Sequence, residues 1–190
     1  MTNYSKIILF VFSIIFIIGC AKPQGATKQE KRDFIEKMKD DSLSELYNKK
    51  PEARYLVKNA AGYGVFSNVS TLLLFLGGGS GYGVVADNAT GKKTYMNMAL
   101  ADIGLGVGIK DFRAVFIFNN RDVMNTFIYS GWEFGAEADA ALKSEEKGAA
   151  GSGAASVKQD IIVYQITDAG IALKAGLRGM KFWRNNELNY

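Results

Sequence analysis

Two glycine-rich segments constrain the fold more than any other feature of the sequence. Residues 77–83 read Gly-Gly-Gly-Ser-Gly-Tyr-Gly, and in residues 104–109 Gly alternates with Leu, Val and Ile. A period of two is typical of a β-strand, because successive side chains point to opposite faces of the sheet. Alternate glycines clear one strand face, so that another backbone, an aromatic ring or an acyl chain can approach closely. The segments therefore predict strands that line either a narrow apolar groove or a tightly curved small barrel.

A phosphate-binding loop is the other interpretation of residues 77–83. The segment lacks the Gly-x-Gly-x-x-Gly register and the Gly-Lys-Ser/Thr triplet of such loops, and strand-like Val84-Val85 follows it where a helix should begin. We therefore favour the strand interpretation.

The first third of the mature chain has helical periodicity. Residues 28–40 place Phe34, Ile35 and Met38 on one face, and Ser42-Leu43-Ser44-Glu45 has the form of a capping box that restarts the helix. Pro51 suits the start of a further helix, which Gly62 ends.

Beyond residue 62 the period changes to two, with apolar runs over residues 65–69 and 72–76. The pattern predicts a strand over 79–86, a hairpin loop over 87–91, and strands over 92–98, 102–109 and 114–118, with a tight turn at Lys110-Asp111. One inserted helix is capped by Asn119-Asn120 and stopped by Gly131. A strand over 132–142, a flexible loop over 143–156 and a meander of strands over 160–167, 171–177 and 180–183 follow. Hairpin-length links leave no room for parallel crossovers. We expect an α+β fold: N-terminal helices, then a glycine-rich, mostly antiparallel sheet or partly closed barrel.

Composition excludes several kinds of chemistry. The 190 residues contain no histidine and one cysteine. The chain therefore has no imidazole base, no Ser-His-Asp triad, no His-bearing metal site and no intrachain disulfide. We expect a non-enzymatic protein with no cofactor and no metal site.

The N-terminus resembles a bacterial lipoprotein signal. Lys6 precedes an apolar run over residues 7–18, which is too short for a comfortable membrane span, and Ile17-Ile18-Gly19-Cys20 follows as in a lipobox. The alternative is a buried cysteine in an anchor helix. We expect a signal peptide over residues 1–19, lipidation of Cys20, a tether over 20–27 and a single domain over 28–190. By the same resemblance, Ala21 favours the outer membrane, with the domain facing the periplasm.

Positive charge gathers beside this anchor. Residues 20–60 carry ten Lys and Arg against seven Asp and Glu, whereas residues 61–190 carry twelve of each. Attraction to anionic headgroups acts there, at about 1 kcal/mol per basic residue. The alternative is an ordinary solvated helix with interleaved charges. The candidate lipid-binding residues in this region are Lys28, Lys31, Arg32, Lys37 and Lys39.

A second basic cluster lies near the C-terminus, where aromatic residues sit among the cations. This composition suits contact with headgroups, although Phe182 and Trp183 closing the core is an equal alternative. Nucleic-acid surfaces have a similar composition, but an exported lipoprotein rarely meets nucleic acid, so we expect none as a partner. The candidates here are Lys174, Arg178, Lys181, Trp183 and Arg184.

An acidic row follows Trp132: Glu133, Glu137 and Asp139 fall on one face of a predicted strand. Paired carboxylates can act as acid and base or hold a metal through oxygen. No apolar context that would raise a pKa and no metal-loop spacing accompanies them, so we favour a solvated strand face.

Four blocks in order resemble the bacterial lipoprotein branch of the SYLF lipid-binding domain family: residues 58–69, 77–85, 127–138 and 163–176. The resemblance covers most of residues 50–188. It implies a non-enzymatic domain that binds membrane lipids; in eukaryotic relatives the ligands are phosphoinositides, and some relatives bind actin. This chain departs from those relatives at Tyr95-Met96-Asn97-Met98, which replaces a Trp-Ser-x-Pro-like stretch, and at Ser67, which replaces a proline. Anionic phospholipid is the ligand class we expect in a bacterial envelope.

The sequence thus predicts a lipoprotein that binds anionic headgroups of a phospholipid membrane. Two rivals come from other classes. The first is a structural envelope protein that binds a protein partner through an exposed helix face around Phe34, Ile35 and Met38. The second is a hydrolase acting through Glu133 and Glu137.

Overall fold

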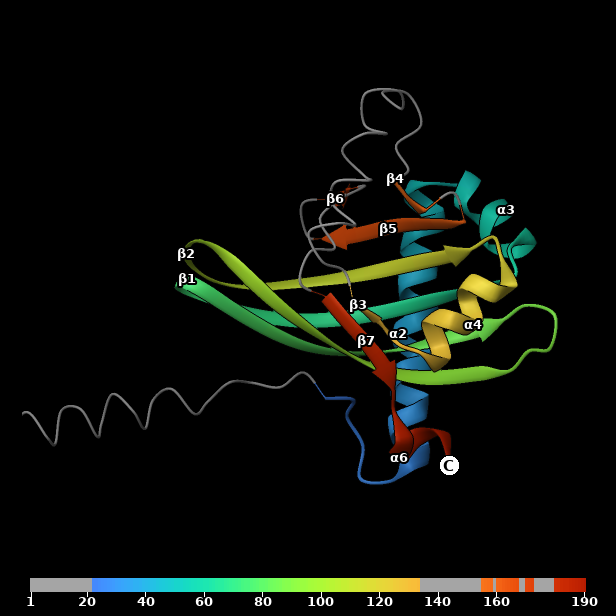
Figure 1. The fold of residues 1–190 in the computed structure, drawn as a ribbon, viewed down its shortest axis with the longest axis horizontal. Helices are drawn as coiled ribbons and strands as arrows, with labels where there is room; N and C mark the ends of the chain where they lie inside the picture. The colour runs from blue at the N-terminus through green and yellow to red at the C-terminus, as the bar shows by residue number, and fades with distance from the viewer. Residues whose placement is uncertain (1–21, 134–154, 159, 168–169, 173–179) are drawn as a thin grey trace, which may run out of the picture.

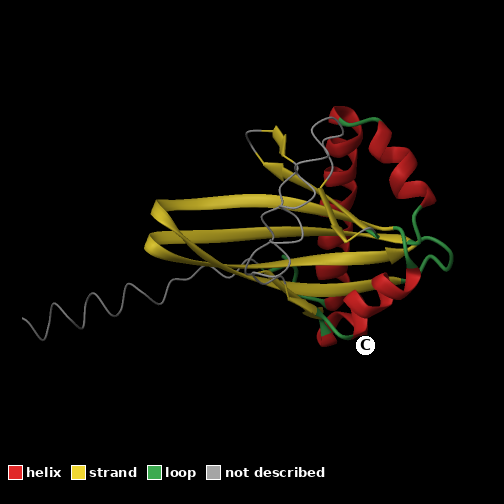
Figure 2. Cartoon of the chain, turned by 45° about the horizontal axis from the view of Figure 1, so that its top comes forward, coloured by secondary structure: helices red, strands yellow, loops and turns green. Residues whose placement is uncertain are grey.

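A computed structural model describes residues 22–133, 155–158, 160–167, 170–172 and 180–190. The fold is α+β, and every strand pair in its sheet is antiparallel. The helices gather at one end of the sheet (Figure 2). In chain order the elements are α2 (Lys28–Lys49), α3 (Glu52–Asn59), β1 (Gly62–Asp87), β2 (Lys93–Phe118), α4 (Arg121–Tyr129), β3 (Trp132–Glu133), β4 (Ala155–Lys158), β5 (Ile161–Thr167), β6 (Gly170–Ala172), β7 (Met180–Arg184) and α6 (Asn186–Asn189).

Helix α2 is one continuous helix of 22 residues. Its capping box is formed by Thr27 and Glu30, whose carboxylate accepts from the Thr27 amide at 3.0 Å. The capping box expected at Ser42 is wrong: the Ser42 hydroxyl is buried and donates to the carbonyl of Met38 at 2.7 Å. A serine inside a helix can donate its hydroxyl to the carbonyl four residues earlier, so Ser42 does not mark the start of a new helix.

Strands β1 and β2 form a ribbon of two 26-residue strands that bends back on itself at its far end (Figure 1). The hairpin loop expected over residues 87–91 is confirmed, with Gly91 at a φ of 69°. The turn expected at Lys110-Asp111 is wrong, because both residues continue the ladder opposite Ser70 and Val69. The apolar runs over 65–69 and 72–76 belong to one strand, β1, with a register shift between Leu74 and Leu76.

The glycines of β1 allow the two halves of this strand to meet. A Cβ at Gly83 would run into the Val65 carbonyl and the Phe66 ring, and one at Gly81 would run into the Ser67 carbonyl. Close approach of another backbone, the first of the interpretations above, is therefore confirmed at these two positions.

The strand order β3-β7-β2-β5-β4 is an open path, with β1 pairing β2 and β6 pairing β5. The sheet is therefore open rather than a closed barrel. The strands expected over 160–167 and 180–183 are confirmed as β5 and β7. Of the segments expected over 132–142, 143–156 and 171–177, the greater part lies outside the described residues. Helix α6 had no signal in the sequence analysis.

Two apolar clusters stabilise the sheet, one on each face. One is covered by α4 and centres on the rings of Phe66, Phe116, Phe127 and Phe182, whose neighbouring centroids lie 4.8–5.9 Å apart. Edge-to-face rings at these separations add to the burial energy. The other cluster lies under α2 and α3. All the buried side chains of the described residues lie between residues 35 and 188, so residues 22–190 carry this whole core.

Candidate functional site

Helix α6 ties the start of α2 to the end of the chain. Lys31 Nζ lies 2.7 Å from the Glu187 carboxylate, and the Arg32 Nε–H donates to the Leu188 carbonyl at 2.9 Å. The hydrogen bond from Lys31 holds the pKa of Glu187 below its usual value. The first turns of α2 and the last residues therefore form one surface, and residues 22–25 lie beside it (Figure 1).

Arg184, at the end of β7, lies at the centre of this surface. Its guanidinium carbon is 5.3 Å from the ring centre of Tyr129 and 5.8 Å from that of Tyr190. Its Nε–H is buried and has no hydrogen-bond partner among the described residues. The rings thus hold the arginine by cation–π contact, which does not use the N–H donors at the end of the guanidinium.

Exposed aromatic rings surround Arg184. Among the described residues the large exposed apolar side chains are Tyr55, Tyr129, Trp183 and Tyr190. Tyr129 and Tyr190 contact Arg184, and Trp183 is its neighbour in the chain and is 40% exposed. Amphipathic rings beside a cation are typical of a surface that meets the headgroup level of a membrane.

A cleft of about 700 Å³ lies between residues 183–188 and residues 22–25. Trp183 and Arg184 line it from the sheet, and Lys22 and Lys31 line it from the chain that precedes and begins α2. Lys181 and Trp183 also line a neighbouring hollow beneath α4. We call the following residues the aromatic–basic surface: Lys22, Lys31, Tyr129, Lys181, Trp183, Arg184 and Tyr190.

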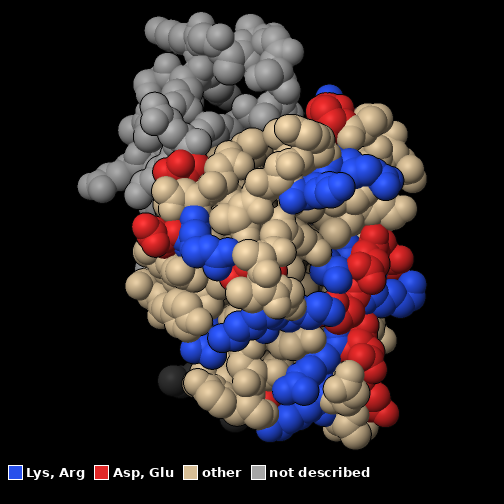
Figure 3. Space-filling view, turned by 90° about the vertical axis from the view of Figure 1, so that its right-hand side faces the viewer, with Lys and Arg blue, Asp and Glu red and all other residues tan. Residues whose placement is uncertain are grey.

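Basic side chains form several bands across the face in Figure 3, and acidic side chains lie beside them, mainly along its right-hand edge. Positive charge on this face is therefore partly offset, as the interleaved sequence of α2 predicts.

The structure separates the predicted basic residues into distinct roles. Lys31, Lys181, Trp183 and Arg184 come together on the aromatic–basic surface. Lys28 lies at its rim, where its Nζ donates to the Tyr190 carbonyl at 3.0 Å. The sequence analysis placed the N-terminal and C-terminal candidates in separate clusters, and α6 joins them.

Three other predicted residues face elsewhere. Arg32 is engaged by the Leu188 carbonyl and lies 5.8 Å from the ring centre of Tyr95, so it holds α6 in place. Lys37 pairs with Asp41 at 3.1 Å, one turn further along the helix. Lys39 is buried, so we correct its expected role as a lipid contact.

The partners of Lys39 explain its burial. Its Nζ lies 2.7 Å from the Glu36 carboxylate, which also accepts from Lys93 at 2.6 Å and from the Tyr95 hydroxyl at 3.2 Å. Burial opposes the charge of Glu36, but the hydrogen bonds from Lys39 and Lys93 prevail, and the pKa of Glu36 is lowered. Burial and the Glu36 charge raise the pKa of Tyr95 to about 12. This cluster joins α2 to β2.

Several predicted residues lie outside the described residues: Cys20, Lys174, Arg178, Glu137 and Asp139. Of the acidic row, Glu133 is described in its backbone, as the residue of β3 opposite Lys181 of β7. Among the residues that the structure describes, no group of three His, Cys, Asp or Glu side chains could hold a metal ion.

The helix face proposed for a protein partner is not exposed. Ile35 and Met38 of α2 are buried between this helix and the sheet. The centre of the Phe34 ring lies 5.7 Å from that of the Tyr82 ring. That predicted patch is therefore wrong, because the apolar face of α2 is covered by the sheet.

Sequence reasoning missed Lys22, Tyr129 and Tyr190. Lys22 could have been found from the sequence, because it lies two residues after Cys20 of the lipidation motif. The tyrosines carried no such signal, because only the fold brings the end of α4 and the last residue to Arg184. Asn68 was also missed: it is fully buried, and neither of its amide atoms has a hydrogen-bond partner.

No model of a known protein family matches the chain. The chain is similar to a protein of Aeromonas veronii named beta cell expansion factor A, with 34% identity over 162 residues. The similar region covers 85% of this chain and 60% of that relative, so the chain spans less than two thirds of the relative's length. Within the described residues, no helix is both long and apolar enough to cross a membrane.

Proposed function

We propose that this chain is a non-catalytic lipoprotein whose domain binds the anionic headgroups of a phospholipid membrane. In this proposal Cys20 carries the lipid anchor at the outer membrane and the domain faces the periplasm. The observation that carries the proposal is the aromatic–basic surface, which gathers Lys22, Lys31 and Arg184 with three exposed aromatic rings where the N-terminal segment leaves the fold. The resemblance to the SYLF lipid-binding family supports the same ligand class.

Arg184 is the residue best suited to a phosphate. A guanidinium offers a planar fork of donors that matches two phosphate oxygens. The rings of Tyr129 and Tyr190 hold that fork in place, so little side-chain freedom is lost on binding. Trp183 then places its ring among the headgroups, with its apolar body toward the acyl chains.

The anchor makes weak contacts sufficient. Each basic residue near an anionic surface contributes about 1 kcal/mol. Residue 22 lies two positions after Cys20, so lipidation holds Lys22 close to the membrane and raises the local concentration of headgroups at the cleft. The domain needs no high intrinsic affinity to stay oriented against the bilayer.

Co-sedimentation of residues 22–190 with vesicles tests the domain without its anchor. We expect binding to phosphatidylglycerol vesicles, little binding to phosphatidylcholine vesicles, and loss of binding as salt rises. The triple variant K22Q/K181Q/R184Q should bind at least about tenfold more weakly, from three lost basic contacts.

The matched control is K37Q/K58Q/K92Q, which removes the same charge from exposed positions away from the aromatic–basic surface. This variant should retain most of the binding. Equal losses in the two variants would mean that net charge alone attracts the vesicles. Absence of wild-type binding to either vesicle would leave the anchor as a simple tether and contradict the proposal.

A further inference from the structure

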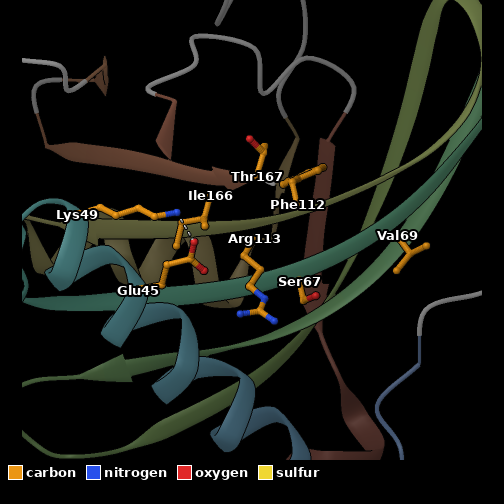
Figure 4. A pocket seen from close by; sticks show the side chains of 8 residues that line it. All are labelled: Glu45, Lys49, Ser67, Val69, Phe112, Arg113, Ile166 and Thr167. Atoms are coloured by element: carbon orange, nitrogen blue, oxygen red, sulfur yellow. Dashed lines mark hydrogen bonds and ion pairs between the residues drawn. The ribbon is translucent and has the colours of Figure 1, made fainter. Parts of the chain in front are cut away.

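The last turns of α2 and the sheet enclose a second cleft, distant in the fold from α6. It has a volume of about 460 Å³, within the range of small-molecule sites. Arg113 of β2 and Ser67 of β1 face each other in the strand register, and Lys49 and Glu45 come from α2 (Figure 4). We call this the Arg113 cleft; its lining residues are Glu45, Lys49, Ser67, Val69, Phe112, Arg113, Ile166 and Thr167.

Arg113 is the unusual group in this cleft. Arg113 lies on the same face of β2 as Val115 and Ile117, because every second residue of a strand points to the same side. Val115 and Ile117 are fully buried in the cluster under α2 and α3. The Arg113 side chain is half-buried, yet no hydrogen bond or ion pair joins its guanidinium to any residue that the structure describes. A half-buried charge favours a counter-group, and the described residues supply none, so the guanidinium is suited to binding an anion.

The neighbours of Arg113 do not neutralise it. Glu45 is engaged by Lys49, with 2.6 Å between the carboxylate and Nζ. Burial raises the pKa of the Tyr82 hydroxyl, which Ser67 and Arg113 only partly counter, so that hydroxyl stays neutral at physiological pH. Of the described residues, the charged ones that line the cleft are Lys49, Glu45 and Arg113, and together they leave one positive charge.

We propose that the Arg113 cleft binds a singly charged oxyanion group, a carboxylate or a phosphodiester. The guanidinium fork would hold two oxygens of that group. Ser67 adds a hydroxyl, while Val69 and Ile166 accommodate a small apolar body. Glu45 disfavours a doubly charged anion, because its carboxylate lies in the same cleft. This site is separate from the aromatic–basic surface and does not depend on the proposed function.

Amide chemical shifts of residues 22–190 test the proposal with propionate and dimethyl phosphate as probes. We expect saturable shifts at residues 67, 113 and 167 with at least one probe. R113Q should weaken that probe's binding by about tenfold or more, because a charge-assisted bidentate pair is lost. The control K58Q, at an exposed position of α3 that lines neither site, should leave the shifts at residues 67, 113 and 167 unchanged.

Glu45→Gln tests the charge argument independently. Removing that carboxylate raises the net charge of the cleft by one, so E45Q should bind inorganic phosphate, added at a pH where it is a dianion, more tightly than the unaltered chain. The Glu45 side chain is 34% exposed and pairs with Lys49 of the same helix, so the variant should remain folded.

Phosphatidylglycerol vesicles separate the two sources of the anion. If the vesicles displace the probe from the unaltered chain, the group belongs to a lipid headgroup; if they do not, it belongs to a free small molecule. Either result keeps the site. Unaltered probe binding in R113Q, or absence of shifts at residues 67, 113 and 167 with both probes, would overturn it.

Discussion

Arg184 and Arg113 both lie on strands of one sheet, and no ion pair is found for either among the described residues, yet their surroundings differ. Arg184 is held between two tyrosine rings on a surface rich in exposed aromatics. Arg113 lies in a cleft between α2 and the sheet, beside hydroxyls and a carboxylate. The first setting suits an extended, flat partner such as a membrane, and the second suits a small group that enters a hollow.

The difference comes from the element that covers each arginine. Beside α6 the rings of Trp183 and Tyr190 are exposed, whereas the last turns of α2 bring Glu45 and Lys49 to the cleft that Arg113 lines (Figure 4). Between the two, the Glu36 cluster fixes α2 to β2. The same residue type therefore acquires two roles from what packs above it.

The largest effect is expected where the aromatic–basic surface meets the core. Phe182 lies between Trp183 and Lys181 in β7, is fully buried and packs against three other phenylalanine rings. F182A should lower the free energy of unfolding by about 3–5 kcal/mol, measured by urea unfolding of residues 22–190.

The matched change at the other region is F112A, since Phe112 lines the Arg113 cleft and is slightly exposed. A site that already adjoins a hollow leaves less new cavity, so we expect a loss of about 2–3 kcal/mol. A loss for F112A equal to that for F182A would mean that the Arg113 cleft is closed in solution.

The next effect concerns the Glu36 cluster that lies between the two regions. E36Q leaves the buried Lys39 without its main carboxylate and removes the acceptor of Lys93 and Tyr95. The free energy of unfolding should fall by about 1–3 kcal/mol. E45Q breaks a partly exposed ion pair with Lys49 near the C-terminal end of α2. It should lower the free energy of unfolding by less than about 0.5 kcal/mol. Similar losses for the two variants would contradict a structural role for the buried cluster.

A smaller effect of opposite sign is expected behind the Arg113 cleft. Asn68 lies between Ser67 and Val69 in β1, on the buried face, and neither amide atom has a partner among the described residues. N68L keeps the branched shape of the side chain and removes the unpaired polar group, so stability should rise by about 1 kcal/mol, the gain being reduced by the larger size of leucine. S42A is the comparison, since the Ser42 hydroxyl has a partner and its loss should destabilise. A drop in stability for N68L would show that the amide makes an interaction in solution.

Local signals predicted the elements whose boundaries are made by neighbouring residues. Asn120 caps α4 by accepting from the Asp122 amide at 2.8 Å, and the loop after Asp87 follows its turn residues. Breaks were predicted wrongly where a polar residue continues an element through a distant partner. Lys110-Asp111 stays in strand because Ser70 and Val69 pair with it from across the ribbon.

The candidate sites were predictable only in part, for the same reason. The basic and aromatic composition of residues 181–184 marked the end of β7 from the sequence alone. The end of β7 comes next to Lys31 only because Glu187 of α6 pairs with that lysine. Arg113 lines a cleft only because the last turns of α2 pack beside β2. Neither is encoded in local spacing, because each arises from contacts between segments far apart in the chain.

The smallest effect concerns pH at the aromatic–basic surface. The hydrogen bond from Lys31 lowers the pKa of Glu187 below 4.5, so this carboxylate adds stability above that pH and loses it as the pH falls through the lowered pKa. E187Q should therefore be slightly less stable than the unaltered chain at pH 7, and the difference should fade as the pH falls below 4.5 and through the lowered pKa. Asp87, whose pKa the Arg121 hydrogen bond lowers to about 2, provides the comparison. The destabilisation of D87N should persist to lower pH than that of E187Q, in urea midpoints measured from pH 7 to pH 2. If the E187Q difference is unchanged at pH 2, the Lys31–Glu187 ion pair does not hold α6 against α2 in solution.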